Sequence, residues 1–313
     1  GRPRFKKKSA GYATARWTRR GFAVSGSGLG TEQADRLEVA VAGGRMPLRV
    51  VWSRPLPSAP TSVTVYRDRA GRWWASFVCR VQLPEVTAEL TGRATGLDVG
   101  LATFATTEDP GGDVANPRFA KAAAKAKARA DRHLARTQKA SNGRAKARRS
   151  KAKIEAKVAA QRTDFHHKAA RKLLAVYHRI GVEDLAVKNL TRRGRRRAKT
   201  GLNRSIADAG WAHFRAVLAW QAAKAGKQVV VLPARDSTQR CSHCGAKAKP
   251  RIELSDRVFR CRCCGLVMDR DRNAARNLNP DRLGPDGGTE PSRSNPAGDD
   301  GSKTKVPAGV EAA

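Results

Sequence analysis

Four cysteines stand in two closely spaced pairs towards the carboxyl end of the chain. Cys241 and Cys244 form one Cys-x-x-Cys pair, and Cys261 and Cys264 form the other. Two thiolates on one tight turn can bind the same zinc ion at about 2.3 Å, and four thiolates complete a tetrahedral site without an open position. The spacing therefore predicts a zinc ribbon in which the metal stabilises the fold and does not catalyse, with Cys263 as a spare thiol.

Three acidic residues that lie far apart in the sequence each stand at a strand or a strand–helix junction: Asp98, Glu183 and Asp271. A carboxylate in an apolar strand costs free energy unless a partner compensates it. Carboxylate oxygens are suitable ligands for Mg²⁺, and two such ions can activate a water and stabilise a leaving oxygen in phosphodiester cleavage. Local alternatives stay open, namely a turn aspartate at Asp98 and a helix N-terminus at Asp271.

The charge of the chain indicates the class of its partners. Lysine and arginine number 63 against 27 acidic residues, which gives a formal charge of +36. Such an excess requires a polyanion, and nucleic acid is the obvious one, so most metabolic enzymes are excluded. No apolar run reaches the roughly 18 residues of a membrane helix, and no secretory signal is visible. With paired cysteines of the metal-binding kind, a reducing cytoplasm is expected.

The apolar pattern predicts the elements that must position these residues. Strands are expected at Leu48–Trp52, Ser62–Tyr66, Trp73–Val81, 95–107, 180–190 and Gln228–Leu232. A single amphipathic helix is expected over Ser205–Gly226, and a short helix follows Asp269 and Asp271. Residues 280–313 are rich in Gly, Pro and Asp and are expected to be disordered.

Residues 118–179 are predicted to form long helices interrupted near Ser141–Gly143. Their surface is almost entirely basic, which favours an antiparallel helical pair whose outer face follows phosphates. His166 and His167 are adjacent, so they point to different faces of the helix and are interpreted as structural residues.

Several motifs together resemble one known family. They are Gly-Leu-Asp98-Val-Gly, Val-Glu183-Asp-Leu-Ala-Val-Lys-Asn-Leu, the segment Asn203–Trp211, the two Cys-x-x-Cys pairs, and Asp271-Arg-Asn-Ala-Ala-Arg-Asn-Leu. In this order they are similar to the TnpB (OrfB) proteins, transposon-encoded RNA-guided nucleases that are related to the compact type V CRISPR effectors. The resemblance covers roughly residues 1–279.

The resemblance implies an α/β fold with an RNase H-like RuvC nuclease domain, inserted long basic helices and a four-cysteine zinc ribbon, preceded by a partial β-rich wedge domain. The implied division is a wedge region at 1–90, the nuclease core at 91–240 with its helical insertion at about 118–179, the ribbon at 241–265, the last nuclease segment at 266–279, and the tail at 280–313.

The same resemblance implies a function. Asp98, Glu183 and Asp271 take the three catalytic positions and bind magnesium, while the four cysteines bind structural zinc. The expected activity is Mg²⁺-dependent cleavage of double-stranded target DNA under the direction of a guide RNA from the transposon end, in which base pairing reads the target sequence. Two alternatives remain: a zinc-ribbon nucleic-acid-binding remnant or regulator that cleaves nothing, and a transposase that acts directly in DNA recombination and yields joined DNA.

Overall fold

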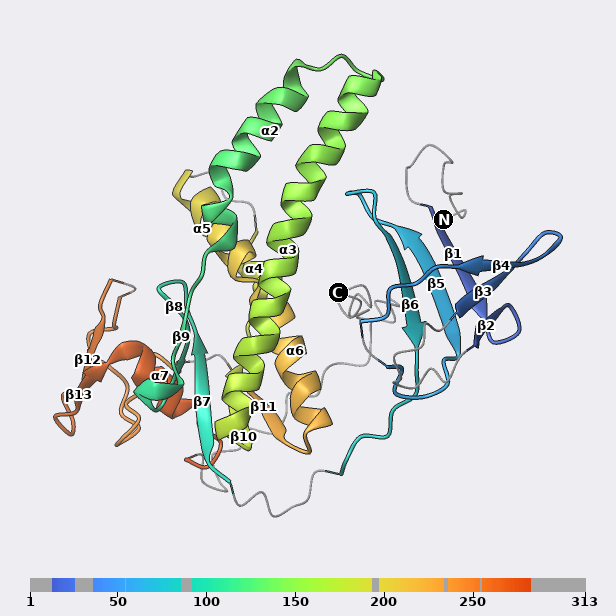
Figure 1. The fold of residues 1–313 in the computed structure, drawn as a ribbon. Coiled ribbons are helices and arrows are strands. Elements are labelled where there is room, and N and C mark those ends of the chain that lie inside the picture. The colour runs from blue at the N-terminus through green and yellow to red at the C-terminus, as the bar shows by residue number, and fades with distance from the viewer. Residues whose placement is uncertain are drawn as a thin grey trace, which may run out of the picture. The chain divides into compact units, whose positions relative to one another are not determined.

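The chain forms two compact units, shown in a computed structural model (Figure 1). The structure describes residues 13–25, 36–53, 55–85, 92–192, 197–233, 236–253 and 255–282. The first unit contains the chain up to Gln82 and Ala123–Ala160, and the second contains Leu83–Ala122 and the described chain from Gln161 onward. Of the tail that the sequence predicts to be disordered, residues 283–313 lie outside the described residues.

The first unit carries two three-stranded antiparallel sheets, in the orders β1-β5-β6 and β2-β3-β4. Their strands are β1 (Thr14–Thr18), β2 (Phe22–Ser25), β3 (Arg36–Val41), β4 (Gly44–Leu48), β5 (Ser62–Arg67) and β6 (Trp73–Val78). The strand predicted at Ser62–Tyr66 is confirmed, and the one predicted at Trp73–Val81 is present but ends at Val78. The strand predicted at Leu48–Trp52 is wrong, because β4 precedes it: a tight turn at Gly43 pairs β4 with β3, and that pairing ends at Leu37 and Leu48.

A long helical hairpin follows the predicted basic segment. Helix α2 (Ala124–Arg136) runs beside the first part of α3 (Asn142–Val176), as Figure 1 shows. The predicted break is confirmed, since Ser141 Oγ accepts a hydrogen bond from the Arg144 amide at 3.1 Å at the start of α3. Two acids join the helices: Lys151 Nζ lies 2.6 Å from Asp131 Oδ1, and Lys127 Nζ lies 3.5 Å from Glu155 Oε1.

The second unit is built on a five-stranded mixed sheet in the order β11-β10-β7-β8-β9. Its strands are β7 (Ala94–Val99), β8 (Thr103–Thr107), β9 (Val114–Ala115), β10 (Arg179–Glu183) and β11 (Gln228–Leu232). Strands β7, β10 and β11 are parallel, while β8 and β9 continue the sheet antiparallel. The strand predicted over 180–190 ends early, because the backbone turns after Glu183 into the short helix α4 (Val187–Leu190).

One face of this sheet packs on α3 and α6 (Trp211–Lys224) around a buried apolar core. That core includes Leu97, Phe104, Leu173, Ile180, Val182, Phe214 and Leu218. The single helix predicted over Ser205–Gly226 is two helices, α5 (Arg197–Ala209) and α6, separated by Gly210 at a φ of +66°. A side chain at Gly210 would also meet Arg162 Cδ at 3.0 Å, so glycine permits the bend and the close packing.

His166 is fully buried in this core, as its interpretation as a structural residue requires. Its Nε2 atom lies 2.9 Å from the Ala209 carbonyl oxygen, and its Nδ1 atom lies 2.8 Å from Nδ1 of His213. Burial is the main cause that lowers the pKa of His166 to about 4, so the side chain is neutral at physiological pH.

The opposite face of the sheet is approached by α7 (Arg270–Asn277), and two glycines make this possible. Gly96 of β7 and Gly181 of β10 are paired in register. An added Cβ at Gly96 would lie 1.8 Å from the Ala275 carbonyl oxygen, and one at Gly181 would lie 1.8 Å from the Leu278 carbonyl oxygen. The backbone of the α7 segment therefore rests directly on two neighbouring strands, which only glycine allows.

Two acidic residues beyond β8 anchor the outer side of α7. Arg272 Nη2 lies 2.8 Å from Asp113 Oδ2, and its Nη1 donates to the Thr107 carbonyl at 2.9 Å. Arg276 and Arg282 both approach Glu108. Within the part of the chain that the structure describes, no helix is both long and apolar enough to cross a membrane.

Substituting Gly96→Ala is expected to destabilise the protein, because the new methyl group cannot coexist with the α7 backbone. Overpacking of this kind costs about 1–3 kcal/mol, or more where backbone must shift. Thermal unfolding of the purified protein measures the effect. Gly201→Ala in α5 is the matched control, since its Cβ would meet nothing within 4 Å and the change favours the helix. Equal midpoints for Gly96→Ala and the unchanged protein would contradict the packing of α7.

Candidate active site and metal centre

Asp98 and Glu183 lie beside each other at the carboxyl ends of neighbouring parallel strands. The register pairs Val182 with Leu97, so the next residue on each strand is an acid. Each acid stands two positions after one of the paired glycines, and strand side chains alternate between faces. Both carboxylates therefore belong to the face that α7 covers, while Leu97 and Val182 point into the core on the other face. Asp271 is in the first turn of α7.

The electrostatics of Asp98 show that the third acid also comes near. Burial raises the pKa of Asp98 well above its usual range, and the negative charges of Asp271 and Glu183 raise it further. Among the described residues, only the cysteines place three or more candidate ligand atoms within 4.8 Å of one another. The charges of both other acids thus act on Asp98, the three are spaced more widely than the ligands of a compact metal cluster, and a cation would relieve the repulsion at Asp98.

Glu183, and not its neighbour Asp184, faces this site. Burial raises the pKa of Glu183, although a hydrogen bond from Ser237 Oγ to Oε1 at 2.5 Å opposes the shift. Asp184 points away from the site, with 67% of its side chain exposed and Arg215 Nη1 at 3.0 Å from its Oδ1. The alternation of strand side chains explains why two adjacent acids have different environments.

Asp271 and Asp269 also have different roles. Asp269 precedes α7 and accepts a hydrogen bond from the Arg272 amide at 2.9 Å, so it is the N-cap of this helix. Asp271 Oδ1 accepts hydrogen bonds from Nε and Nη2 of Arg270 at 3.1 and 2.9 Å. Arg257 Nη1 lies 3.6 Å from the other oxygen of Asp271. Asp269 is therefore the N-cap, while Asp271 lies in the first turn of α7, as the helix N-terminus alternative expects, and also forms a half-buried ion pair with Arg270.

Ser237, Arg270 and Asn273 are residues of this site that the sequence analysis missed. Asn273 is fully buried: its Oδ1 accepts from the Ser242 amide at 2.9 Å, and its Nδ2 donates to the Arg240 carbonyl at 2.7 Å. These bonds tie α7 to the first cysteine turn. Only the position of Asn273 in the motif after Asp271 could have indicated it, since an isolated asparagine or serine gives no local signal.

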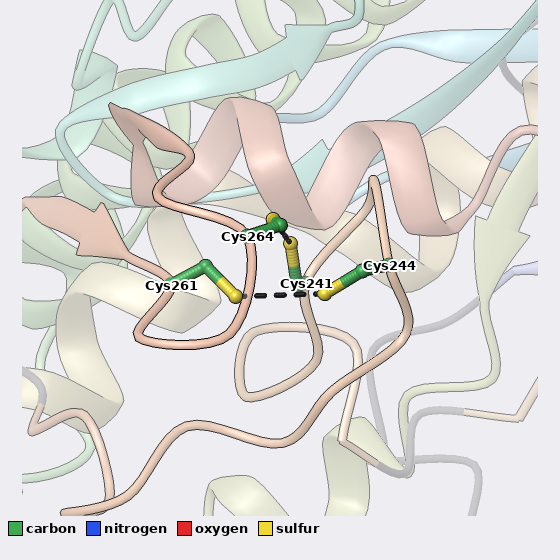
Figure 2. A group of neighbouring side chains, drawn as sticks. All are labelled: Cys241, Cys244, Cys261 and Cys264. Carbon is green, nitrogen blue, oxygen red and sulfur yellow. Dashed lines mark hydrogen bonds between the residues drawn. The ribbon is translucent and has the colours of Figure 1, made fainter.

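The four predicted cysteines converge, as Figure 2 shows. The sulfur atoms of Cys241, Cys244, Cys261 and Cys264 all lie within 4.8 Å of one another. The Sγ atoms of Cys241 and Cys264 are 3.6 Å apart, and those of Cys244 and Cys261 are 3.5 Å apart. Tetrahedral ligands at about 2.3 Å from zinc would be about 3.8 Å apart, so this set fits a zinc ion.

The two cysteine turns have matching backbones. The Gly245 amide donates to the Cys241 carbonyl at 2.9 Å, and the Gly265 amide donates to the Cys261 carbonyl at 3.0 Å. The φ angles are positive, 74° at Gly245 and 76° at Gly265. Only glycine adopts this conformation without strain, so the sequence signal after each pair has a clear physical cause. Strands β12 (Val258–Arg260) and β13 (Val267–Asp269) complete the ribbon around the buried Phe259.

The backbone also prepares a thiolate. Amide groups of Cys264 and Cys263 donate to the Cys261 sulfur and lower the pKa of Cys261 to about 6. Metal ligation requires this deprotonated form. Cys263 itself is exposed and stands outside the group of four, in agreement with its interpretation as a spare thiol.

A mixed sheet with two acids on one face, a helix that brings a third, and an adjoining four-cysteine ribbon give an α/β protein with two candidate metal centres. Two known family models match the chain. Residues 76–194 match the OrfB_IS605 model, described as a probable transposase, and residues 211–278 match the model described as Cas12f1-like, TNB domain.

Three individual relatives have names that describe DNA endonucleases. A putative RNA-guided DNA endonuclease of Streptomyces pristinaespiralis is 35% identical over 88% of this chain and 64% of its own length. The putative RNA-guided DNA endonuclease InsQ of Escherichia coli K12 is 35% identical over 72% of this chain and 58% of its own length. The CRISPR-associated endodeoxyribonuclease Cas12f1 of Sulfoacidibacillus thermotolerans is 22% identical over 69% of this chain and 52% of its own length.

The predicted resemblance to the TnpB (OrfB) family is confirmed: the chain is related to these proteins over most of its length. It spans less than two thirds of each of these relatives.

Replacing Cys261→Ser is expected to abolish zinc binding, because three thiolates leave the site incomplete and structural zinc contributes roughly 10 kcal/mol or more to such folds. Metal analysis of protein purified under reducing conditions should find one zinc per unchanged chain and none in the variant. Cys263→Ser is the matched control, as its thiol is outside the group of four. Zinc-free unchanged protein would contradict the assignment.

Substituting Asp98→Asn is expected to stabilise the protein in buffer without divalent cations. The pKa of Asp98 is raised by folding, so charge on Asp98 destabilises the native state once the pH rises above the unfolded value of about 3.9. The gain in thermal midpoint over the unchanged protein should therefore grow as the pH rises above about 4. Asp184→Asn should stay within about 0.5 kcal/mol at each pH, as exposed substitutions do. A gain that shrinks with rising pH would refute this environment for Asp98.

Proposed function

We propose that this chain is an RNA-guided, Mg²⁺-dependent DNA endonuclease encoded by an insertion sequence, with an RNase H-like RuvC nuclease core. The observation that carries the proposal is the placement of Asp98 and Glu183 on one face of neighbouring parallel strands, under a helix whose first turn carries Asp271. The names of the relatives support the reaction and its guide. The implied division at residues 90, 240, 265 and 279 stays a prediction.

The three acids are the proposed magnesium ligands. When bound, Mg²⁺ would lower the pKa of a water molecule, which makes it a better nucleophile, and would stabilise the leaving oxygen of the phosphodiester. Asp98 and Glu183 would hold one side of the site from the rigid sheet, and Asp271 would complete it from α7. Ser237 orients Glu183 through its hydroxyl group. Carboxylates that repel one another in a partly buried site have the donor chemistry that a divalent cation requires.

Zinc in the ribbon has a structural role in this proposal. Four thiolates leave no open position for substrate. The ribbon continues from β13 directly into α7, and Asn273 binds the first cysteine turn. Folding of the ribbon therefore positions the helix that carries Asp271.

Guide RNA from the transposon end and double-stranded target DNA are the proposed partners. The helical hairpin offers a basic surface for their phosphates. Its exposed basic residues are Lys125, Lys127, Arg129, Arg132 and Arg136 on α2, and Lys146, Arg148, Arg149, Lys153 and Lys157 on α3. The two acids of this region, Asp131 and Glu155, are both in ion pairs with lysines.

A second candidate function, direct transposition, is favoured by the description of the matching family model as a probable transposase. It differs in its product, because strand transfer joins DNA ends whereas a nuclease leaves them cut.

The decisive experiment purifies the protein with its bound RNA, sequences that RNA, and incubates the complex with matching DNA and Mg²⁺. Cut DNA is expected, together with a defined RNA from the transposon end. Asp98→Ala, Glu183→Ala and Asp271→Ala should each lower the rate of cleavage by more than the roughly 10- to 100-fold loss seen for residues that only support a metal ligand, and should retain RNA.

Asp184→Ala is the control, since its side chain points away from the site. Joined DNA would favour the transposase, heterogeneous RNA without cleavage would favour a non-catalytic binder, and undiminished cleavage by any alanine variant of the three acids would refute its assignment.

A further inference from the structure

Arg270 is a buried cation between the ribbon and the three acids. It opens α7 and is only 9% exposed. Two of its nitrogen atoms, Nε and Nη2, donate to Asp271 Oδ1 at 3.1 and 2.9 Å, while Nη1 donates to the Glu253 carbonyl oxygen in the ribbon at 3.2 Å. One guanidinium group thus binds an acid of the candidate active site and the backbone of the ribbon.

This arrangement is imposed by tertiary structure. Adjacent residues of a helix do not normally face each other, so local geometry does not favour contact between Arg270 and Asp271. Two hydrogen bonds to the ribbon hold Arg270 in this contact. Its backbone amide donates to the Arg257 carbonyl at 2.8 Å, and its guanidinium group donates to the Glu253 carbonyl. The planar guanidinium group of arginine has donors in fixed positions and therefore fixes the orientation of the carboxylate that it binds. The flexible ammonium group of a lysine does not.

The charge of Arg270 also acts beyond its direct partner. Four acids contribute negative charge here, because Asp269 and Glu183 add to Asp98 and Asp271. Arg270 is the cation that opposes this repulsion at Asp98. A buried charge of this kind is stable only when it is paired, and removing one partner leaves the other uncompensated.

We propose that Arg270 is a positioning residue that orients Asp271, couples it to the folded ribbon, and serves as the internal counter-cation of the acidic site. The proposal rests on the proposed nuclease function, in which Asp271 is a magnesium ligand. A divalent cation bound by the acids and the guanidinium group of Arg270 then neutralise the same carboxylates, and the two positive charges repel each other. Removing the charge strengthens cation binding, while removing the guanidinium group misorients Asp271.

The test measures two properties of the full chain: binding of Mn²⁺ to the protein without nucleic acid, followed by electron paramagnetic resonance, and cleavage of matching DNA by the RNA-bound protein. Arg270→Gln and Arg270→Lys both remove the guanidinium group and only Gln removes the charge, so the Gln variant should bind Mn²⁺ on the order of three- to tenfold more tightly than the Lys variant. Arg270→Lys keeps the charge but cannot hold Asp271 in a fixed orientation, so its Mn²⁺ affinity should fall below that of the unchanged protein. Both variants should cleave on the order of tenfold more slowly or worse, with zinc content unchanged.

Arg260→Gln is the matched control, because it removes the same charge from an exposed position of the ribbon and should leave Mn²⁺ affinity within about twofold. Equal Mn²⁺ affinity in the Gln and Lys variants, or undiminished cleavage by both Arg270 variants, would overturn the proposal. If Arg270→Gln does not fold, loss of cleavage by a zinc-loaded, folded Arg270→Lys variant still supports positioning. If the unchanged protein cleaves nothing, the nuclease proposal fails, and the Mn²⁺ measurement still decides whether Arg270 is the counter-cation.

Discussion

Direct contact between a helix backbone and two neighbouring strands is the constraint on which the rest of the second unit depends. The α7 segment reaches the sheet only because Gly96 and Gly181 lack side chains at the same register position. That approach brings an acid from a helix to two acids from strands more than 80 residues apart in the sequence (183 − 98 = 85). Interactions of Arg272 and Arg276 with acids beyond β8 then fix the helix from its outer side.

The acids brought together in this way place negative charge around Asp98, and hydrogen bonds and one buried cation offset part of that charge. Ser237 donates a hydrogen bond to Glu183, and Arg270 donates to Asp271. The pKa of Asp98 is raised well above the ordinary range. A site that holds several partly buried carboxylates is less stable than an apolar one would be. Such stored electrostatic cost is typical of functional sites, where a ligand of opposite charge removes it.

What the sequence could predict depended on how local each signal is. The cysteine turns were predictable because two ligands and a glycine lie within five residues, and the register of each turn follows from them. The end of β10 and the break at Gly210 were not, since an apolar run such as Ile180–Leu190 has the same composition in a strand and in a short helix, and a glycine inside a helical pattern marks a bend only when its neighbours crowd it. Arg270 and Ser237 could not be predicted, because their partners are set by tertiary packing.

The junction between the ribbon and α7 has a consequence for how such chains diverge. Strand β13 ends at Asp269 and α7 begins at Arg270, so no loop separates the second cysteine turn from Asp271. One residue inserted before the helix would rotate every later position by about 100° around its axis. The four thiols and all three acids would still be present, yet the last acid would face another direction. In comparing members of this group, the count of residues between Cys264 and Asp271 is therefore as informative as the residues themselves.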